Sequence, residues 1–452
     1  MRSRREFLRT GLVLGTAALV LPGVASGAPR NAASFSAGAG RQEVVFPSGL
    51  YPLDGFAGQH DPLAARVLLL DDGDTRAAIA VVDLTSISAE MIAGMKAILA
   101  EVAGVAADHA IVCASHTFSA PHVFSGGQAP PGTDTSRNAA ALAAFESALR
   151  AAARQAIAAL QPARLGAGQG STRVNVNRDV ATPHGWWLGA NDAGFADSAV
   201  GVLRIDGADG QPLAIVMNAA VQSSVMDGSE RTQGGKLISA DLAGAAARHV
   251  EAHYGADTVA LFLVGAAGDQ APYLQANRHV VDADGRAGRV DIHEAGFALV
   301  ALLGERLGGE VVRVAEGIAA QPAPRLEIRR ESVAVTAQAF SPRNAATGPV
   351  TAFDYAPGAK TALPVLVLRL GDVALVGVQP ELAASIGAQI RADSPWPHTL
   401  VATMVDGAAK YMPDMQSYER YTYEARSSPY ARGAAEAAAT AIVDLLQRMN
   451  TP

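Results

Sequence analysis

The chain has 452 residues, of which 49% are hydrophobic and 17% are charged, and its formal net charge is −7. An apolar fraction near the globular average excludes a disordered chain, and the acidic balance argues against a nucleic-acid-binding protein, which needs a basic face. The single cysteine, Cys113, excludes an intramolecular disulfide framework and a zinc module built from four cysteines.

Residues 1–28 have the pattern of an export signal. Arg4 and Arg5 lie in a twin-arginine-like segment, and a weakly apolar stretch at 11–21 leads to the small residues of a cleavage region. The alternative is a membrane anchor, which is disfavoured because spanning a bilayer takes about 20 apolar residues. We therefore expect twin-arginine export, a periplasmic or extracellular location, no membrane span, and a domain at residues 29–452.

Beyond residue 65, short apolar runs rich in β-branched residues alternate with helical patterns, which is typical of α/β proteins. The predicted strands are 66–70, 77–84, 110–114, 201–205, 214–218, 259–264, 365–370, 373–378 and 399–404. Turn-like segments at 71–74, 207–210 and 371–372 join consecutive runs as hairpins. We therefore expect a single large domain with a mixed β-sheet flanked by helices, since no long linker divides the chain.

Three apolar stripes predict helices. One runs from Ile92 to Ala106 behind a cap at Ser88, one from Leu142 to Leu160 behind a cap at Ser136, and one covers 442–449. These stripes indicate core packing and carry no functional weight. The Pro-rich segments near 129–134, 321–325 and 341–358 are expected to be lids or insertions.

Several familiar catalytic motifs are missing from the sequence. There is no G-x-S-x-G elbow, no H-E-x-x-H and no P-loop. The glycine-rich stretch 166–170 lacks a following helical pattern, so it predicts a strand bend rather than a dinucleotide cradle. Segment 282–285 predicts a turn, because the later Glu of a calcium loop is missing.

Polar residues collect where predicted strands end, which is where α/β proteins place their chemistry. His116, Gln222, Asp269 and Glu381 each follow such a strand, and Tyr411 follows the last one. Nitrogen and oxygen donors of this kind suit zinc. Each also has a structural explanation, because a histidine at a strand end is often only hydrogen bonded and an acid is favoured in the first turn of a helix.

The order of these segments resembles the neutral/alkaline (non-lysosomal) ceramidase family of zinc amidohydrolases. The resemblance covers roughly residues 38–434 and rests on an ordered set of short motifs rather than on any one of them. These motifs lie at 58–63, 115–121, 176–178, 218–222, 238–244, 265–272, 379–381, 410–413 and 423–424. The family's C-terminal immunoglobulin-like domain is expected to be missing.

The resemblance implies a metal site and a mechanism. Zn²⁺ would activate a water that attacks the amide bond of a small-molecule or lipid-like N-acyl substrate. Two further side chains of the family hold the carbonyl oxygen. Residue by residue, the zinc ligands fall on His116, Gln222, Glu381 and Tyr411, and the carbonyl-holding pair falls on Arg178 and Tyr423.

Three departures fall within the site itself. Gln222 replaces a zinc-binding histidine, Phe118 replaces the second histidine of the H-T-H motif, and Gly265 replaces a serine. An amide oxygen is a weaker zinc ligand than imidazole, and His122 or His60 could supply a nitrogen instead. The hypotheses are therefore a zinc-dependent amide hydrolase of lipid-like substrates, a non-catalytic exported binding protein, or an ester or lactone hydrolase on the same scaffold.

Overall fold

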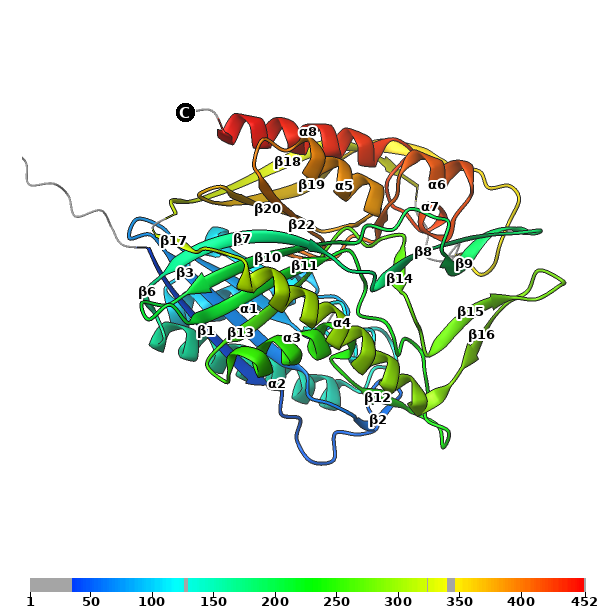
Figure 1. Cartoon of the computed structure of the whole chain (residues 1–452). Helices are drawn as coiled ribbons and strands as arrows, with labels where there is room; N and C mark the ends of the chain where they lie inside the picture. The colour runs from blue at the N-terminus through cyan, green and yellow to red at the C-terminus, as the bar shows by residue number, and fades with distance from the viewer. Residues whose placement is uncertain (1–34, 126–128, 323, 340–345, 451–452) are drawn as a thin grey trace, which may run out of the picture. The chain divides into compact units, whose positions relative to one another are not determined.

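The computed structural model describes residues 35–125, 129–322, 324–339 and 346–450 (Figure 1). All of these residues belong to one compact unit, Ser34–Pro452. The predicted export signal lies outside the described residues. No helix within the described ranges is long and apolar enough to cross a membrane.

Most of the strands belong to three larger sheets (Figure 1). The first has the order β5 (Ala110–Ala114), β4 (Arg76–Val82), β3 (Ala64–Asp71), β1 (Ser36–Glu43) and β6 (Gln161–Pro162). The second has the order β13 (Val259–Val264), β11 (Pro212–Ala219), β10 (Ala199–Asp206), β7 (Arg164–Ser171) and β17 (Gln321–Pro322). The third has the order β18 (Leu326–Gln338), β19 (Pro357–Leu370), β20 (Val373–Val378) and β22 (His398–Ala402).

Four smaller sheets complete the strands of the described residues. They pair β2 (Phe56–Gln59) with β12 (Lys236–Ile238), β15 (Asn277–Val281) with β16 (Ala287–Asp291), and β21 (Glu381–Leu382) with β23 (Tyr411–Met412). A three-stranded sheet has the order β14 (Gln270–Pro272), β8 (Asn175–Thr182) and β9 (Gly185–Asn191).

The predicted α/β class is confirmed, and all nine predicted strands correspond to observed strands. The three predicted hairpins join antiparallel partners, whereas the pairs β4–β5, β11–β13 and β20–β22 are parallel. The arrangement is therefore mixed, as expected, but the strands are distributed over several sheets rather than in one. The glycines at 166–170 lie inside β7, and 282–285 forms the turn of the β15–β16 hairpin.

The longer helices are α1 (Ala89–Ala103), α2 (Thr135–Ala158), α3 (Asp241–Tyr254), α4 (Phe297–Glu316), α5 (Ala384–Asp393) and α8 (Ala434–Asn450). Two short helices, α6 (Met415–Glu419) and α7 (Tyr423–Arg426), and the 3₁₀ turns Ala107–His109 and His293–Gly296 lie between longer elements.

Two details of the helix predictions can be compared with these bounds. Ser88 caps α1 as predicted, because its side chain accepts the Met91 N–H. The predicted cap at Ser136 is wrong. Asp134 caps α2 instead, since its carboxylate accepts the N–H groups of Ser136 and Arg137.

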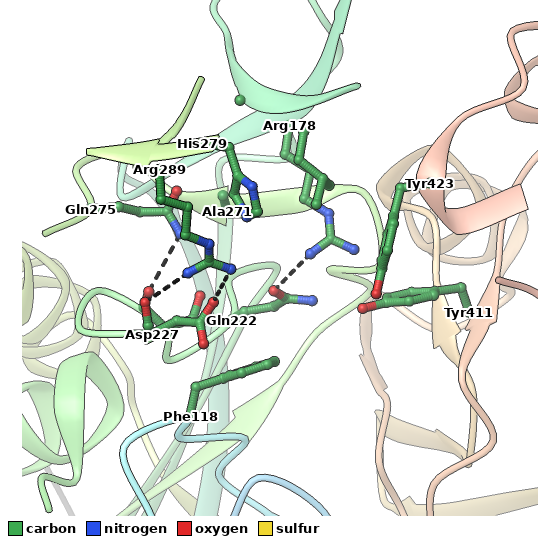
Figure 2. A pocket seen from close by; sticks show the side chains of 13 residues that line it. Phe118, Arg178, Gln222, Asp227, Ala271, Gln275, His279, Arg289, Tyr411 and Tyr423 are labelled. Carbon is green, nitrogen blue, oxygen red and sulfur yellow. Dashed lines mark hydrogen bonds and ion pairs between the residues drawn. The ribbon is translucent and has the colours of Figure 1, made fainter. Parts of the chain in front are cut away.

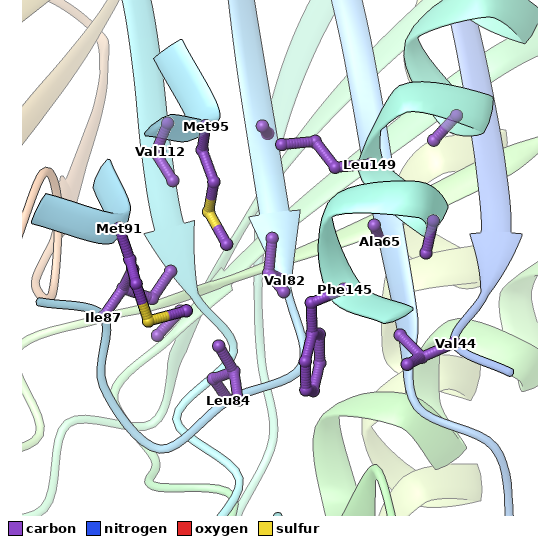
Figure 3. Packing of buried hydrophobic residues seen from close by; sticks show 14 of the residues in the cluster. Val44, Ala65, Val82, Leu84, Ile87, Met91, Met95, Val112, Phe145 and Leu149 are labelled. Atoms are coloured by element: carbon purple, nitrogen blue, oxygen red, sulfur yellow. The ribbon is translucent and has the colours of Figure 1, made fainter. Parts of the chain in front are cut away.

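The three sheets share one apolar core and each is covered by helices on its other face. In β3, Leu68 and Leu70 belong to the shared core, whereas Val67 and Leu69 belong to the cluster under α1 and α2. This period of two is what strands buried on both faces require. Figure 3 shows part of that cluster, with Met91 and Met95 of α1 and Phe145 and Leu149 of α2 beside the strands. Helices α3 and α4 cover the second sheet in the same way, and α5 and α8 cover the third.

Hydrogen bonds and a backbone bridge connect the carboxyl ends of strands in the parallel pairs, β5, β11, β13 and β22. The Asn218 side-chain amide donates to the carbonyls of Leu263 and Val401, at 2.9 and 3.1 Å, and so links β11 to β13 and β22. An isolated bridge joins Thr117 to Ser223, immediately beyond β5 and β11. The loops that leave these strands therefore start close together.

Candidate functional site

Five segments of the chain bring the predicted site residues together. His116 follows β5 in a left-handed backbone conformation, with φ of 60°, and its Nδ1 donates to the Thr85 carbonyl at 2.6 Å. Glu381 and Tyr411 begin β21 and β23, where they are paired in parallel register and thus share a face of the ribbon. Gln222 follows β11, and Arg178 lies on β8.

The centre of the site is a buried pair of opposite charges. His116 Nε2 lies 3.1 Å from Glu381 Oε2, and the two residues are 3% and 7% exposed. Burial alone would lower the pKa of His116, but the Glu381 carboxylate and the Thr85 carbonyl outweigh it and raise the pKa. Burial alone would raise the pKa of Glu381, whereas His116 and Arg178 lower it. Both shifts favour the charged pair.

Gln222 joins this pair to Arg178. Its Nε2 donates to Glu381 Oε2 at 2.7 Å, and its Oε1 accepts from Arg178 Nη1 at 3.0 Å. A guanidinium can only donate and a carboxylate can only accept, so the chemistry of the two partners fixes the orientation of the amide. Gln222 is therefore bonded at both ends of its side chain.

Arg178 is also bonded to an acid, Glu424, to which the sequence motifs assigned no role. Its Nε donates to Glu424 Oε1 at 2.6 Å, and its guanidinium lies 5.0 and 5.9 Å from the ring centres of Tyr411 and Tyr423. Its Nη2 is buried and has no hydrogen-bond partner among the described residues. Burial, followed by the charge of Glu381, raises the pKa of Tyr411 well above its usual range, so its phenol is neutral.

These side chains border a cavity of about 250 Å³ (Figure 2). Arg178, Gln222, Tyr411, Tyr423 and Phe118 line it, together with Leu188, Gly189, Ser224, Asp227, Ala271, Gln275, His279 and Arg289. His116 and Glu381 are not among the lining residues and contact the cavity wall through Gln222. The part of the cavity wall formed by predicted site residues is thus an arginine (Arg178), an amide (Gln222) and two phenols (Tyr411 and Tyr423). The charged pair is bonded to the amide.

Two of the four predicted metal ligands have the spacing of a cation site once His116 Nε2 loses its proton. The 3.1 Å between His116 Nε2 and Glu381 Oε2 is close to the about 3.3 Å that separates ligand atoms of tetrahedral zinc. The bond from His116 Nδ1 to a backbone carbonyl is the support that zinc-binding histidines usually have. Tyr411 lies beside Glu381 and offers a phenol oxygen.

Gln222 does not fit as a ligand in its present orientation. Its oxygen is bonded to Arg178 and its nitrogen faces Glu381, so the amide must rotate and release Arg178 before it can bind a metal. Among the residues that the structure describes, no group of three or more His, Cys, Asp or Glu side chains is arranged to hold a metal ion. The residues that could hold a cation are therefore His116, Glu381 and Tyr411, and Gln222 could join them only after its amide rotates.

The two histidines considered as substitute ligands lie elsewhere. His122 Nδ1 contacts Asp54 Oδ2 at 2.8 Å and lines a separate cavity. The ring of His60 stacks on Phe297 with 3.6 Å between ring centres. Neither residue has a recorded contact with His116, Gln222 or Glu381, so the structure does not bring them to the predicted ligands.

The other two departures from the family pattern, Phe118 and Gly265, both lie in close contact with their neighbours. Phe118 lines the cavity, and its ring lies against that of His116 with 4.8 Å between centres. At Gly265, a Cβ atom would meet the backbone of Ala219 and Ala220 at 2.8 to 2.9 Å. A serine would not fit there without movement of the strand ends.

Comparison with known proteins identifies the fold. The crystal structure of neutral ceramidase from Pseudomonas aeruginosa matches with a TM-score of 0.70 and 19% sequence identity, over 93% of this chain and 75% of that one. The chain has a neutral ceramidase-like fold. A second structure, of a ceramidase complexed with C2, matches with a TM-score of 0.69 and 19% identity, over 93% and 76% of the two chains. No family model and no curated protein matches the sequence.

The ceramidase-like fold confirms the architecture that the sequence motifs implied, whereas the residue roles rest on the geometry of the site. Sequence reasoning missed Glu424, Asp179, Asp227, His279 and Arg289. For Glu424 a signal existed, because it directly follows Tyr423 in one of the motifs, but its partner Arg178 lies 246 residues away.

Proposed function

We propose that this protein is a zinc-dependent hydrolase that cleaves the amide bond of N-acyl substrates. The proposal is carried by one observation. Two predicted zinc ligands, Gln222 and Tyr411, and both predicted carbonyl-holding residues, Arg178 and Tyr423, line a single cavity in a ceramidase-like fold, and the other two predicted ligands, His116 and Glu381, are bonded to each other behind Gln222. Chance placement would scatter side chains so distant in sequence.

Each residue has a definite task in this proposal. Bound zinc would supply Lewis acidity and lower the pKa of a water molecule. His116, Glu381 and Tyr411 would hold it. The unpartnered Nη2 of Arg178 can donate to the substrate carbonyl oxygen, and Tyr423, whose ring centre lies 5.9 Å from the guanidinium, would assist, so that negative charge developing on that oxygen is stabilised. Glu424 fixes Arg178 by holding its Nε.

A second candidate function is a binding protein without catalytic activity. The observation that favours it is the closed chain of hydrogen bonds from His116 through Glu381 and Gln222 to Arg178. Each of these four side chains is hydrogen bonded to its neighbour in the series without a metal ion. Such a site could bind an acyl compound while hydrolysing nothing.

Metal analysis separates the two functions. We expect protein purified without chelators to bind zinc at one equivalent. Gln222→His should bind it more tightly, by about tenfold or more, because imidazole is the better ligand. Glu381→Ala should lose it. His122→Ala is the control, since His122 lies in another cavity, and it should retain wild-type zinc content.

If the wild type neither contains nor takes up zinc, the hydrolase proposal fails and the binding protein remains. If Gln222→His and Glu381→Ala have the same zinc affinity as the wild type, the assignment of the ligands is wrong.

We also propose that the protein reaches the periplasm or the extracellular space by twin-arginine export. Arg4 and Arg5, followed by the weakly apolar stretch, support this proposal.

A further inference from the structure

The cavity holds more hydrogen-bonding capacity than the protein itself uses. Arg178 Nη2 and Ser224 Oγ are both buried and have no partner among the described residues, and both residues line the cavity. They are 8% and 3% exposed. Leaving a buried donor unpaired is unfavourable, so oxygen atoms of a ligand are the expected partners of these groups.

The lining also carries an excess of positive charge, although the chain as a whole is acidic. Arg178 and Arg289 line the cavity, against a single acid, Asp227. Asp227 Oδ2 accepts from Arg289 Nη2 at 3.0 Å, and its backbone carbonyl accepts from Arg289 Nη1 at 2.9 Å. Glu424, which pairs with Arg178, does not line the cavity.

His279, in the cavity wall, is affected by burial and by the positive charge of the two arginines. Burial and then Arg289 lower the pKa of His279 to about 4, with a further contribution from Arg178, and Asp227 opposes them only in part. His279 therefore stays uncharged at neutral pH. Burial disfavours any charge there, but the contributions of the two arginines oppose a cation and favour an anion.

The β15–β16 hairpin places these groups. His279 and Arg289 are paired across it, so they share one face, and that face borders the cavity (Figure 2). Arg278, one residue earlier, lies on the opposite face. It lines an adjoining cavity of about 420 Å³ whose wall includes Val176, Ala190, Pro272, Tyr273 and Leu274. Gly189, Gln275 and His279 line both cavities.

We propose that the amine part of the substrate carries a carboxylate, so that the substrates are N-acyl amino acids. The carboxylate lies on the Arg289 side of the polar cavity, and the amide carbonyl lies at Arg178. The acyl chain extends into the adjoining cavity along its apolar residues Val176, Pro272 and Leu274 and away from Asp192 and Arg278. Hydrolysis adds water across the amide: the acyl carbon gains the oxygen, the C–N bond breaks, and the amine nitrogen takes a proton.

The cleavage step rests on the proposed function, but recognition of the carboxylate can be measured without it. Calorimetric titration of the full-length protein would compare N-hexanoylglycine with N-hexanoylethanolamine. The two compounds share an acyl chain, but the first ends in a carboxylate where the second has a hydroxymethyl group. We expect the glycine compound to bind about tenfold more tightly or better, and to weaken as salt is added. Equal affinity, tighter binding of the ethanolamide, or no binding of either compound overturns the proposal.

Variants on the same hairpin localise the effect. Arg289→Gln should weaken binding of N-hexanoylglycine by about tenfold and leave the ethanolamide nearly unchanged. Asp227→Asn should tighten binding of the glycine compound, because it removes the opposing charge. A general loss of structure would instead weaken both compounds in both variants.

Arg286→Gln is the matched control, since it removes the same charge from the exposed turn of the same hairpin, where Arg286 pairs with Asp284. If it weakens the glycine compound as much as Arg289→Gln does, the attraction is not local to the cavity and the proposal fails.

Mass spectrometry of the same mixtures distinguishes this inference from the proposed function. Selective binding of the carboxylate without release of glycine supports the carboxylate site and contradicts the hydrolase. Cleavage of both compounds without preference supports the hydrolase and contradicts the carboxylate site.

Discussion

Gln222 shows how one side chain can change what a site does. With its oxygen on Arg178 and its nitrogen on Glu381, it links a positive to a negative group and leaves neither unpaired. To act as a metal ligand it must give up both bonds, and burial makes each of them costly to lose. In the proposed zinc site, Gln222 would therefore bind the metal more weakly than a histidine for two reasons, the poorer donor and the hydrogen bonds that must first break.

Asp179 lies behind this network and is 5% exposed. Burial, then the neighbouring Glu424 and Asp269, hold its pKa well above the usual range, while Arg178 opposes them. This direction favours the protonated form of Asp179, because two buried carboxyl groups beside each other are more stable when one of them is neutral. A neutral Asp179 leaves the Glu424 carboxylate to pair with Arg178.

This protonation makes stability depend on pH. Above the usual aspartate pKa, the unfolded chain has lost the Asp179 proton while the folded protein retains it, so the unfolding free energy falls as pH rises. Asp179→Asn cannot ionise. We expect its fall in unfolding free energy between pH 5 and pH 8 to be smaller than that of the wild type, by up to about 1.4 kcal/mol per pH unit.

Urea denaturation at both pH values measures this difference. Asp74→Asn, in the exposed β3–β4 turn, makes the same charge change and should follow the wild type. Parallel falls in the wild type and Asp179→Asn would show that Asp179 is not the protonated partner.

At the scale of elements, the strands that the sequence predicted are those buried on both faces. β5, β13 and β20 are continuous apolar runs, and their predicted bounds agree with the structure to the residue. By contrast, β1 is rich in glycine and β18 alternates charged with apolar residues, so neither gives such a run. Their pairing depends on partners distant in the chain.

The short ribbon β21–β23 positions two of the proposed ligands, and Gly268 allows its approach. The Gly268 N–H donates to the Leu382 carbonyl at 2.8 Å, and a Cβ atom at this position would lie 2.5 Å from the Glu381 carbonyl oxygen. Because both contacts are with backbone, Gly268→Ala must push β21 away. We expect it to cost about 1–3 kcal/mol of stability and to lower zinc affinity.

Thermal unfolding and zinc titration measure the two effects. Gly94→Ala is the control, since Gly94 lies inside α1 and a Cβ atom there would meet nothing within 4 Å. It should be neutral or stabilising, by up to about 1 kcal/mol. Unchanged zinc affinity in a folded Gly268→Ala protein would show that the position of β21 does not govern the site.

For the whole molecule, the ordered motifs were sufficient to predict the ceramidase-like fold, and they named Arg178, Gln222, Tyr411 and Tyr423 of the cavity wall but not Asp227, His279 or Arg289. They could not show that Gln222 is bonded at both ends, or that His60 is held by Phe297 and His122 by Asp54. Those facts depend on packing between segments far apart in sequence. A motif records which residues are present, whereas the partners of each residue follow from the complete fold.

The same long-range packing gives the proposed export route a physical rationale. A bridge joins Cys113 to Val405, and β17 pairs with β7, so native pairing requires most of the chain to be present. Folds with many such contacts form slowly, and transport after folding avoids exposing their unpaired strands.

We expect the wild type to be found folded outside the cytoplasm, and Arg4→Lys/Arg5→Lys to accumulate folded inside it. Cell fractionation with protease digestion checks both, and Arg9→Lys, outside the arginine pair, should be exported normally; equal export of all three proteins would exclude recognition of the pair.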